Sequence, residues 1–208
     1  TILMDDEEWT FKSLEGYNDS AFVTCNGSWK PDPVAGKALA LTLKATDVPL
    51  EDELRNALAT NAQTFWHSLH PRGTIDYVAV NLRYESASND LSVDVTGQKR
   101  GAQQNVEGRS ITIKPSWLPY QLDDVTGLVS FRNGVAALQR VKGRHGNTAL
   151  EMSGQFTTLP NDQWQFEATD LHVDRLRATH ELVAALPPRL GSAITKLRFD
   201  GAVRMSGR

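Results

Sequence analysis

The chain has 208 residues, with 22 Lys and Arg against 25 Asp and Glu, and a formal net charge of −3. This near-balanced charge argues against a nucleic-acid binder, which usually presents a basic face. No apolar stretch approaches the ~20 residues that a membrane-spanning helix needs. Cys25 is the single cysteine and cannot form an internal disulfide. Because the chain opens with Thr1 and shows no signal peptide or charged tail, we expect a piece of a longer protein.

The first part of the chain predicts short strands, followed by a helix. Leu39, Leu41 and Leu43 alternate with small or polar residues, which is the period of a strand with one apolar face. The pattern then changes to a helical stripe of apolar residues, with Pro49 suited to the first turn and Pro71 beyond the end. We therefore expect a helix over 49–69.

Strands resume after Gly73, and Asn133-Gly134 is a strong hairpin signal. A second helix is expected over 174–186, ended by Pro187-Pro188, with a closing strand through Leu197, Phe199, Val203 and Met205. The predicted fold class is mainly β with α (α+β). Repeated antiparallel strands would form a curved open sheet or groove, with one amphipathic helix per repeat.

The chain also matches itself. Residues 11–29 align with 138–156 at a spacing of 127, which places Gly16 on Gly143 and Gly27 on Gly154. Further matches join 45–47 (Ala-Thr-Asp) to 168–170 and 73–75 to 201–203. These matches predict one repeat unit over 1–127 and a partial second unit over 128–208. Neighbouring repeats of a longer chain would extend the sheet.

The segment 120–156 carries glycines at fixed places around a strand, a turn and a returning strand: Gly127, Gly143, Gly146 and Gly154. This pattern resembles the repeat of AsmA-like proteins, the superfamily that includes TamB and YhdP. The first copy departs from it, since Asp19 stands where the second copy has Gly146. The resemblance implies a half-rolled antiparallel sheet with an apolar concave face, on the periplasmic side of a membrane-anchored protein of the bacterial cell envelope. It also implies passive handling of phospholipid or another acyl lipid, or a part in outer-membrane biogenesis.

Such a groove needs continuous apolar lining, because each methylene buried from water is worth roughly 0.8 kcal/mol. Alternating strands supply that lining without any special residue. The set that we predict to line it is Leu91, Val93, Val95, Ile111, Ile113, Val129 and Phe131. The predicted helix over 49–69 would cover the same sheet or cap its end.

The sequence lacks three common catalytic and cofactor motifs: it has no G-x-S-x-G elbow, no P-loop and no C-x-x-C. We expect no enzyme, no cofactor and no metal site. His67 and His70 are better explained as polar residues at a helix end, and Cys25 as a small packed hydrophobe.

Two alternatives stay open. One is a structural or protein-interaction repeat scaffold without a ligand. The other is an enzyme whose site is built from scattered residues such as His67, His70 and Asp76.

Overall fold

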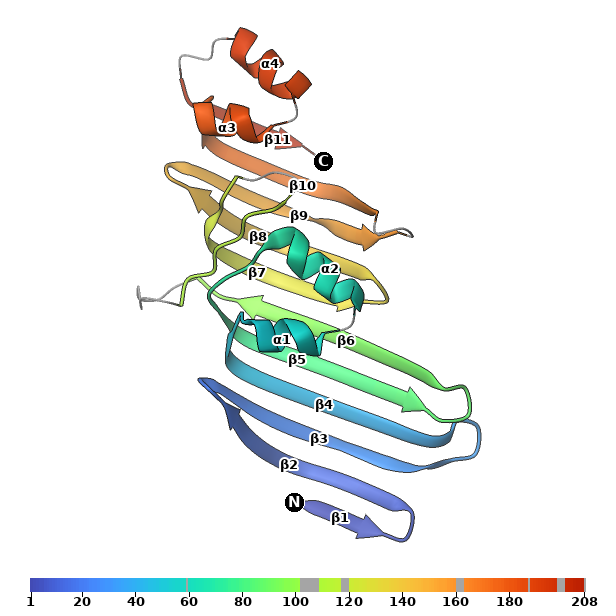
Figure 1. Cartoon of the computed structure of the whole chain (residues 1–208). Coiled ribbons are helices and arrows are strands. Elements are labelled where there is room, and N and C mark those ends of the chain that lie inside the picture. Colours follow the sequence, from blue (N-terminus) through green and yellow to red (C-terminus); the bar gives the residue numbers. More distant parts are fainter. Residues whose placement is uncertain are drawn as a thin grey trace.

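The computed structural model describes residues 1–58, 60–101, 109–116, 120–159, 163–186, 188–197 and 201–207. Over these residues the chain forms one open antiparallel sheet in which each strand pairs with the next along the sequence (Figure 1). The eleven strands are β1 Ile2–Asp5, β2 Glu8–Asn18, β3 Ala21–Asp32, β4 Gly36–Pro49, β5 Thr74–Glu85, β6 Asp90–Lys99, β7 Asp123–Arg132, β8 Val135–His145, β9 Thr148–Thr158, β10 Trp164–Leu176 and β11 Val203–Gly207.

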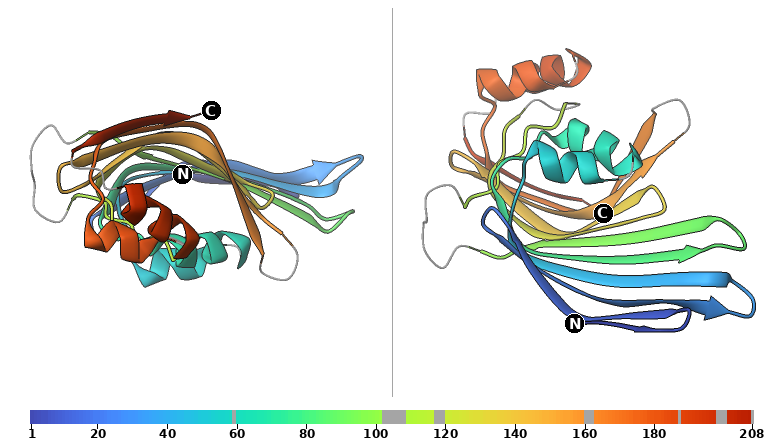
Figure 2. Two further views of the ribbon diagram at one scale, coloured as in Figure 1. Left: turned by 90° about the horizontal axis from the view of Figure 1, so that it is seen from above. Right: turned by 60° about the horizontal axis from the view of Figure 1, so that its bottom comes forward.

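In the described part of the chain, four short helices interrupt this meander: α1 Asp52–Ala57 and α2 Thr60–Leu69 between β4 and β5, then α3 His180–Ala185 and α4 Pro188–Leu197 between β10 and β11. The sheet is curved, and the helices lie on its concave side (Figure 2). None of the helices in the described residues is long and apolar enough to cross a membrane.

The expectation of one helix per repeat is wrong. Each predicted helix is replaced by a pair, and the backbone between the members turns extended, with ψ of 154° at Leu58 and 152° at Leu186. An unbroken helix over 49–69 would be a straight rod of about 30 Å. The break lets the two short helices follow the curve of the sheet and contact different strands.

The second helical region also begins later than predicted. Residues 174–176 still belong to β10, and α3 starts at His180, where the Thr179 hydroxyl accepts a hydrogen bond from the Leu182 N–H. Pro188 opens α4 instead of ending a helix, because a proline at the first helical position loses no backbone hydrogen bond. Leu197 ends α4 and is not in a strand, while Pro187 and Phe199 lie outside the described residues.

Ile111 and Ile113, which we predicted to line the groove as part of an alternating strand, lie outside the strands of the sheet. This segment makes two isolated bridges, Arg72 with Thr112 and Ile113 with Leu122. It lies against the sheet because Ile111, only 7% exposed, packs on Val125 and Val141.

Element positions recur along the chain. β2 and β3 begin at residues 8 and 21, and β8 and β9 begin at residues 135 and 148, in each case 127 residues later. α1 and α2 begin at 52 and 60, and α3 and α4 begin at 180 and 188, in each case 128 residues later. Left-handed residues recur as well, with φ of 47° at both Ser13 and Arg140. The unit boundary at 127/128 stays a prediction.

The match of 45–47 with 168–170 is not a structural equivalence. Ala45 pairs with Val23 of β3, whereas Ala168 pairs with Gly154 of β9. Gly154 corresponds to Gly27 at the spacing of 127, and Gly27 pairs with Leu41. Ala168 therefore corresponds to Leu41 and not to Ala45. The two identical triplets lie at different positions along their strands.

Candidate apolar ligand surface

The two faces of the sheet differ in chemistry because successive side chains of a strand point to opposite sides. Cross-strand partners share a face, and the face toward the helices is apolar. One row across it reads Phe11, Gly27, Leu41, Leu82 and Val93. The next row reads Cys25, Leu43, Val80, Val95 and Phe131. On the other face the corresponding rows are mostly polar, as in Thr24, Lys44, Ala79 and Thr96.

Over β7–β9 this apolar face is covered. The Phe65 ring of α2 packs on Phe156 of β9 with ring centroids 4.9 Å apart, and Phe156 is 2% exposed. The end of α2 is held against the 109–116 segment between β6 and β7, since the Lys114 and Ser116 N–H groups donate to the Leu69 and Ser68 carbonyls. This half therefore holds an ordinary core.

α1 forms the boundary of the covered region. Its Leu54 packs against the cluster of Ala21, Val48 and Val78, at the end of the strands where β4 leads into the helices. Val80 and Val95 pack against the same cluster from the sheet side. The end of the apolar face near α1 is therefore closed.

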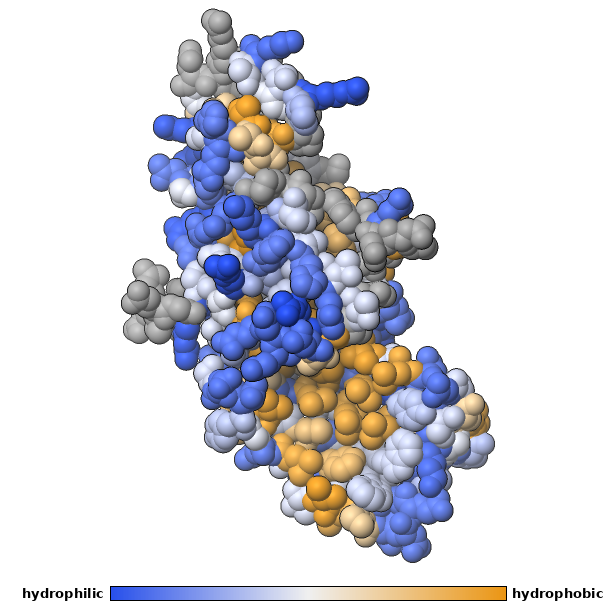
Figure 3. Space-filling model, viewed as in Figure 1, coloured by the Kyte–Doolittle hydropathy of each residue, from blue (hydrophilic) through white to orange (hydrophobic). Residues whose placement is uncertain are grey.

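Over β1–β6 the apolar face is open between α1 and the opposite ends of the strands. Figure 3 shows an apolar surface beside the hydrophilic outer side of the helices. Leu41, Leu43, Leu82 and Val93 are only half-buried, and Leu91 is 58% exposed. Among the described residues no large side chain is fully buried. A face of this kind offers apolar contact to a ligand.

An aromatic row borders the open surface near the hairpin tips. Trp9 pairs with Trp29, and the row continues through Leu39 and Tyr84 to Leu91. The Trp29 and Tyr84 rings stack with centroids 6.3 Å apart and planes 9° apart. The Tyr84 hydroxyl donates to Asn89 Oδ1 at 3.1 Å, toward the β5–β6 tip. This row presents apolar ring faces together with polar groups at the limit of the apolar surface.

The residues predicted to line a groove fall into two environments. Leu91 and Val93 lie on β6 at the open surface, whereas Val95 packs against the cluster that closes the face near α1 and pairs with Phe131 of β7. Ile111, Ile113 and Val129 instead belong to the packed cluster around Val125 and Val141. They share that cluster because the 109–116 segment folds back over the sheet.

The sequence-based set omitted most of the open surface, which β2–β5 supply. The omitted residues are Trp9, Phe11, Cys25, Trp29, Leu39, Leu41, Leu43, Val80, Leu82 and Tyr84. Their alternation was visible in the sequence. Which strands the helices leave open was not, because that depends on where α1 and α2 pack.

The titratable residues near this surface form ion pairs and hydrogen bonds. Burial raises the pKa of Asp76, but the Lys99 side chain at 2.6 Å and the Arg100 N–H at 2.8 Å outweigh it and set that pKa below its ordinary value. On the open face, burial raises the pKa of the Cys25 thiol. A raised pKa keeps the thiol protonated, as befits a packing residue.

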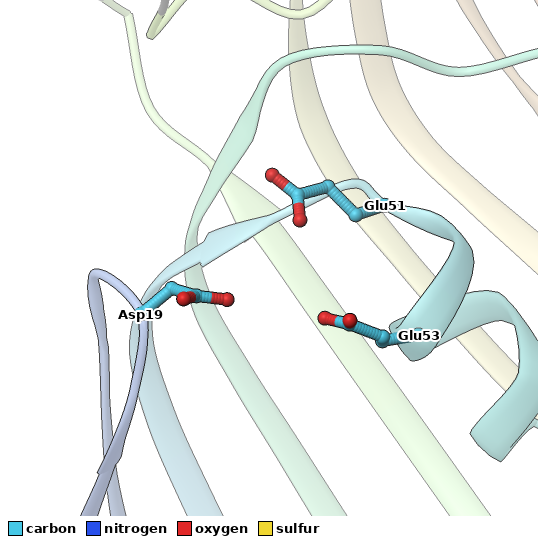
Figure 4. A group of neighbouring side chains, drawn as sticks. All are labelled: Asp19, Glu51 and Glu53. Carbon is cyan, nitrogen blue, oxygen red and sulfur yellow. The ribbon is translucent and has the colours of Figure 1, made fainter.

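Among the described residues, one group of acidic side chains has three ligand atoms within 4.8 Å of one another. It consists of Asp19, Glu51 and Glu53, all exposed (Figure 4). His67, His70 and Asp76 form no such group. His67 lies in the last turn of α2, and His70 follows that helix with φ of 47°, donating its backbone N–H to the Trp66 carbonyl.

No protein-family model matches the chain, and no curated protein and no solved structure is significantly similar to it.

Proposed function

We propose that this chain is a non-enzymatic, AsmA-like module of the bacterial cell envelope that holds acyl lipid passively on the open apolar face of β1–β6. The observation that carries the proposal is the uncovered apolar surface of those strands, with Leu91 58% exposed and Leu41 and Leu82 half-buried. The glycine pattern of 120–156 and its resemblance to AsmA-like proteins support the same conclusion. Periplasmic location and a role in lipid transfer or outer-membrane biogenesis belong to this proposal.

A bound lipid tail needs a continuous apolar surface. A lipid tail that leaves a bilayer must find apolar contact along its whole length, because each methylene left in water costs roughly 0.8 kcal/mol. Adjacent register rows provide an unbroken apolar path across β2–β6, from Phe11 to Val93 and from Cys25 to Val95. The polar residues of the opposite face keep the other side of the sheet in water.

The test compares two aspartate substitutions on one strand. Val93 lies on the open apolar face, and Ser92, its neighbour, lies on the opposite face, paired with Arg83. The protein is incubated with dioleoylphosphatidylcholine vesicles and re-isolated, and bound lipid is counted by native mass spectrometry and solvent extraction. We expect near-stoichiometric lipid on the unmodified protein and on Ser92→Asp, and a loss of at least tenfold on Val93→Asp. Circular dichroism and urea unfolding confirm that both variants remain folded.

A repeat scaffold without a ligand is the second candidate, and the exposed edge strand β1 favours it. Ile2, Leu3 and Met4 are 53%, 47% and 67% exposed at one edge of the sheet, and an apolar open edge can pair with another strand. Absence of bound lipid together with concentration-dependent association in light scattering would support this scaffold instead. Equal lipid binding by both aspartate variants would place the lipid elsewhere on the molecule.

A further inference from the structure

The open apolar face has two unlike ends. At one end, α1 closes it through Leu54, which packs on Val48 and Val78. At the other end lie the β1–β2, β3–β4 and β5–β6 connections, here called the hairpin-tip edge and defined as residues 5–8, 30–37 and 85–90. A ligand on this face can place a polar group in water only at the end that is not closed.

The length of the face between these ends matches one lipid tail. On β4, the residues from Leu39 to Ala45 run from the aromatic row to the α1 cluster, six steps along the strand. Six steps span about 20 Å. The tails of one bilayer leaflet span about 15 Å, half of a hydrocarbon core of about 30 Å. A tail laid along the strands therefore fits between the aromatic row and α1.

The aromatic row marks where the apolar part of such a ligand ends. Trp and Tyr concentrate where membranes meet water, because each carries an apolar ring and a polar group. Trp9, 42% exposed, pairs with Trp29, and Trp29 stacks on Tyr84, whose hydroxyl donates to Asn89 at the tip. Rings at this position would contact the part of a tail next to its headgroup. The polar groups of the hairpin tips, beyond the rings, would face the headgroup itself.

The charge of the hairpin-tip edge is strongly negative. Residues 5–8, 30–37 and 85–90 contain seven carboxylates and two lysines. Lys37 is paired with Glu7 at 3.6 Å, which leaves it poorly placed to attract a second anion. Asp32 accepts the Val34 and Ala35 N–H groups, both at 2.8 Å, and these bonds lower its pKa, so that it stays ionised.

We propose that bound lipid lies with its tails along the strands and its headgroup at the hairpin-tip edge, beside Trp29 and Tyr84, and that this edge selects a zwitterionic phospholipid over an anionic one. This inference rests on the proposed function. The outermost group of a zwitterionic headgroup is a cationic amine, which the carboxylates attract. An anionic headgroup brings a net negative charge to the same edge and is repelled.

The first experiment measures headgroup selection. The protein is incubated with vesicles holding equal amounts of dioleoylphosphatidylcholine and dioleoylphosphatidylglycerol, re-isolated and extracted, and the two lipids are quantified. Five excess negative charges about 10 Å away, screened at physiological salt, predict about threefold more phosphatidylcholine. The triple variant Glu8→Gln/Glu85→Gln/Asp90→Asn lowers this ratio below about twofold. These tip residues are exposed, so the fold is retained.

A matched control removes three carboxylates at the opposite end of the strands: Asp19→Asn/Glu51→Gln/Glu53→Gln. It carries the same change in net charge and leaves the ratio at that of the unmodified protein. If both triple variants changed the ratio equally, total charge and not the hairpin-tip edge would set the selection, and the inference would be wrong.

The second experiment measures orientation. Phosphatidylcholine carrying a photoreactive diazirine on the headgroup should crosslink within residues 29–37 and 84–91. The same lipid with the diazirine at the tail end should crosslink near Cys25, Leu43 and Val80, four residues further along the strands. Headgroup adducts near Val48 or Leu54, or an excess of bound phosphatidylglycerol, would overturn the inference while leaving the proposed function standing. Absence of any bound lipid would overturn both.

Discussion

Two valine-to-alanine substitutions test whether β6 lies on an open surface. Val141 is 8% exposed within a packed cluster, and Val93 is half-buried on the open face. The substitution removes two methyl groups, a transfer free energy of about 1.6 kcal/mol when the side chain is fully buried. At Val141 a cavity adds to this, and we expect a loss of about 2.5 kcal/mol in the free energy of unfolding.

At Val93 the side chain is partly exposed already, so that only part of the transfer term applies, and water fills the vacated space, so that no cavity forms. We expect a loss of about 1 to 1.4 kcal/mol. Both free energies are obtained from urea unfolding followed by circular dichroism. The two variants are compared with the same slope m of the free energy of unfolding against urea concentration. A loss at Val93 as large as that at Val141 would refute the reasoning, because it would mean that other side chains fill the face over β6.

Two further predictions concern single contacts. Asp76→Asn should cost about 1 to 2 kcal/mol at pH 7, because it weakens the bond to Lys99. Since the pKa of Asp76 is lowered in the folded protein, this contribution is fully present above the ordinary value of about 4 and shrinks as pH falls from there through the lowered pKa of the folded state; a difference in urea unfolding that did not shrink between about pH 7 and pH 2.5 would contradict the assignment. Gly27→Ala should destabilise the sheet by more than about 1 kcal/mol, because the added Cβ overlaps the Ala40 carbonyl oxygen, whereas Gly16→Ala meets no atom within 4 Å. Equal midpoints of thermal unfolding for the two alanine variants would contradict that packing.

Much of the sheet could be predicted from local chemistry. The alternation of Leu39, Leu41 and Leu43 marks β4, and Asn133-Gly134 marks the β7–β8 turn, because side-chain period and turn conformation depend on neighbouring residues. The glycines of 11–29 and 138–156 align at a spacing of 127, and the starts of β2 and β8 are the same distance apart.

Where the prediction of the second helix failed, the fault lay in where the preceding strand ends: the helix was placed over 174–186 before Pro187-Pro188, but residues 174–176 continue β10. The Ala-Thr-Asp triplets at 45–47 and 168–170 separately suggested a repeat spacing of 123. The structure has α1 and α3 at a spacing of 128. A match of only three common residues can arise by chance, without structural equivalence. The strand pairing shows this, because Ala45 pairs with Val23 and so does not occupy the position that corresponds to Ala168.

The sequence by itself determined that this chain makes alternating strands with one apolar face, and that two helical regions interrupt them. Only the tertiary structure decided which part of that face is open. α2 reaches forward to Phe156 of β9, and the 109–116 segment folds onto Val125 and Val141, so that the apolar face of β7–β9 is covered. The face of β1–β6 is left open, because the packing of a helix on a distant strand depends on curvature and long-range contact that no local pattern encodes.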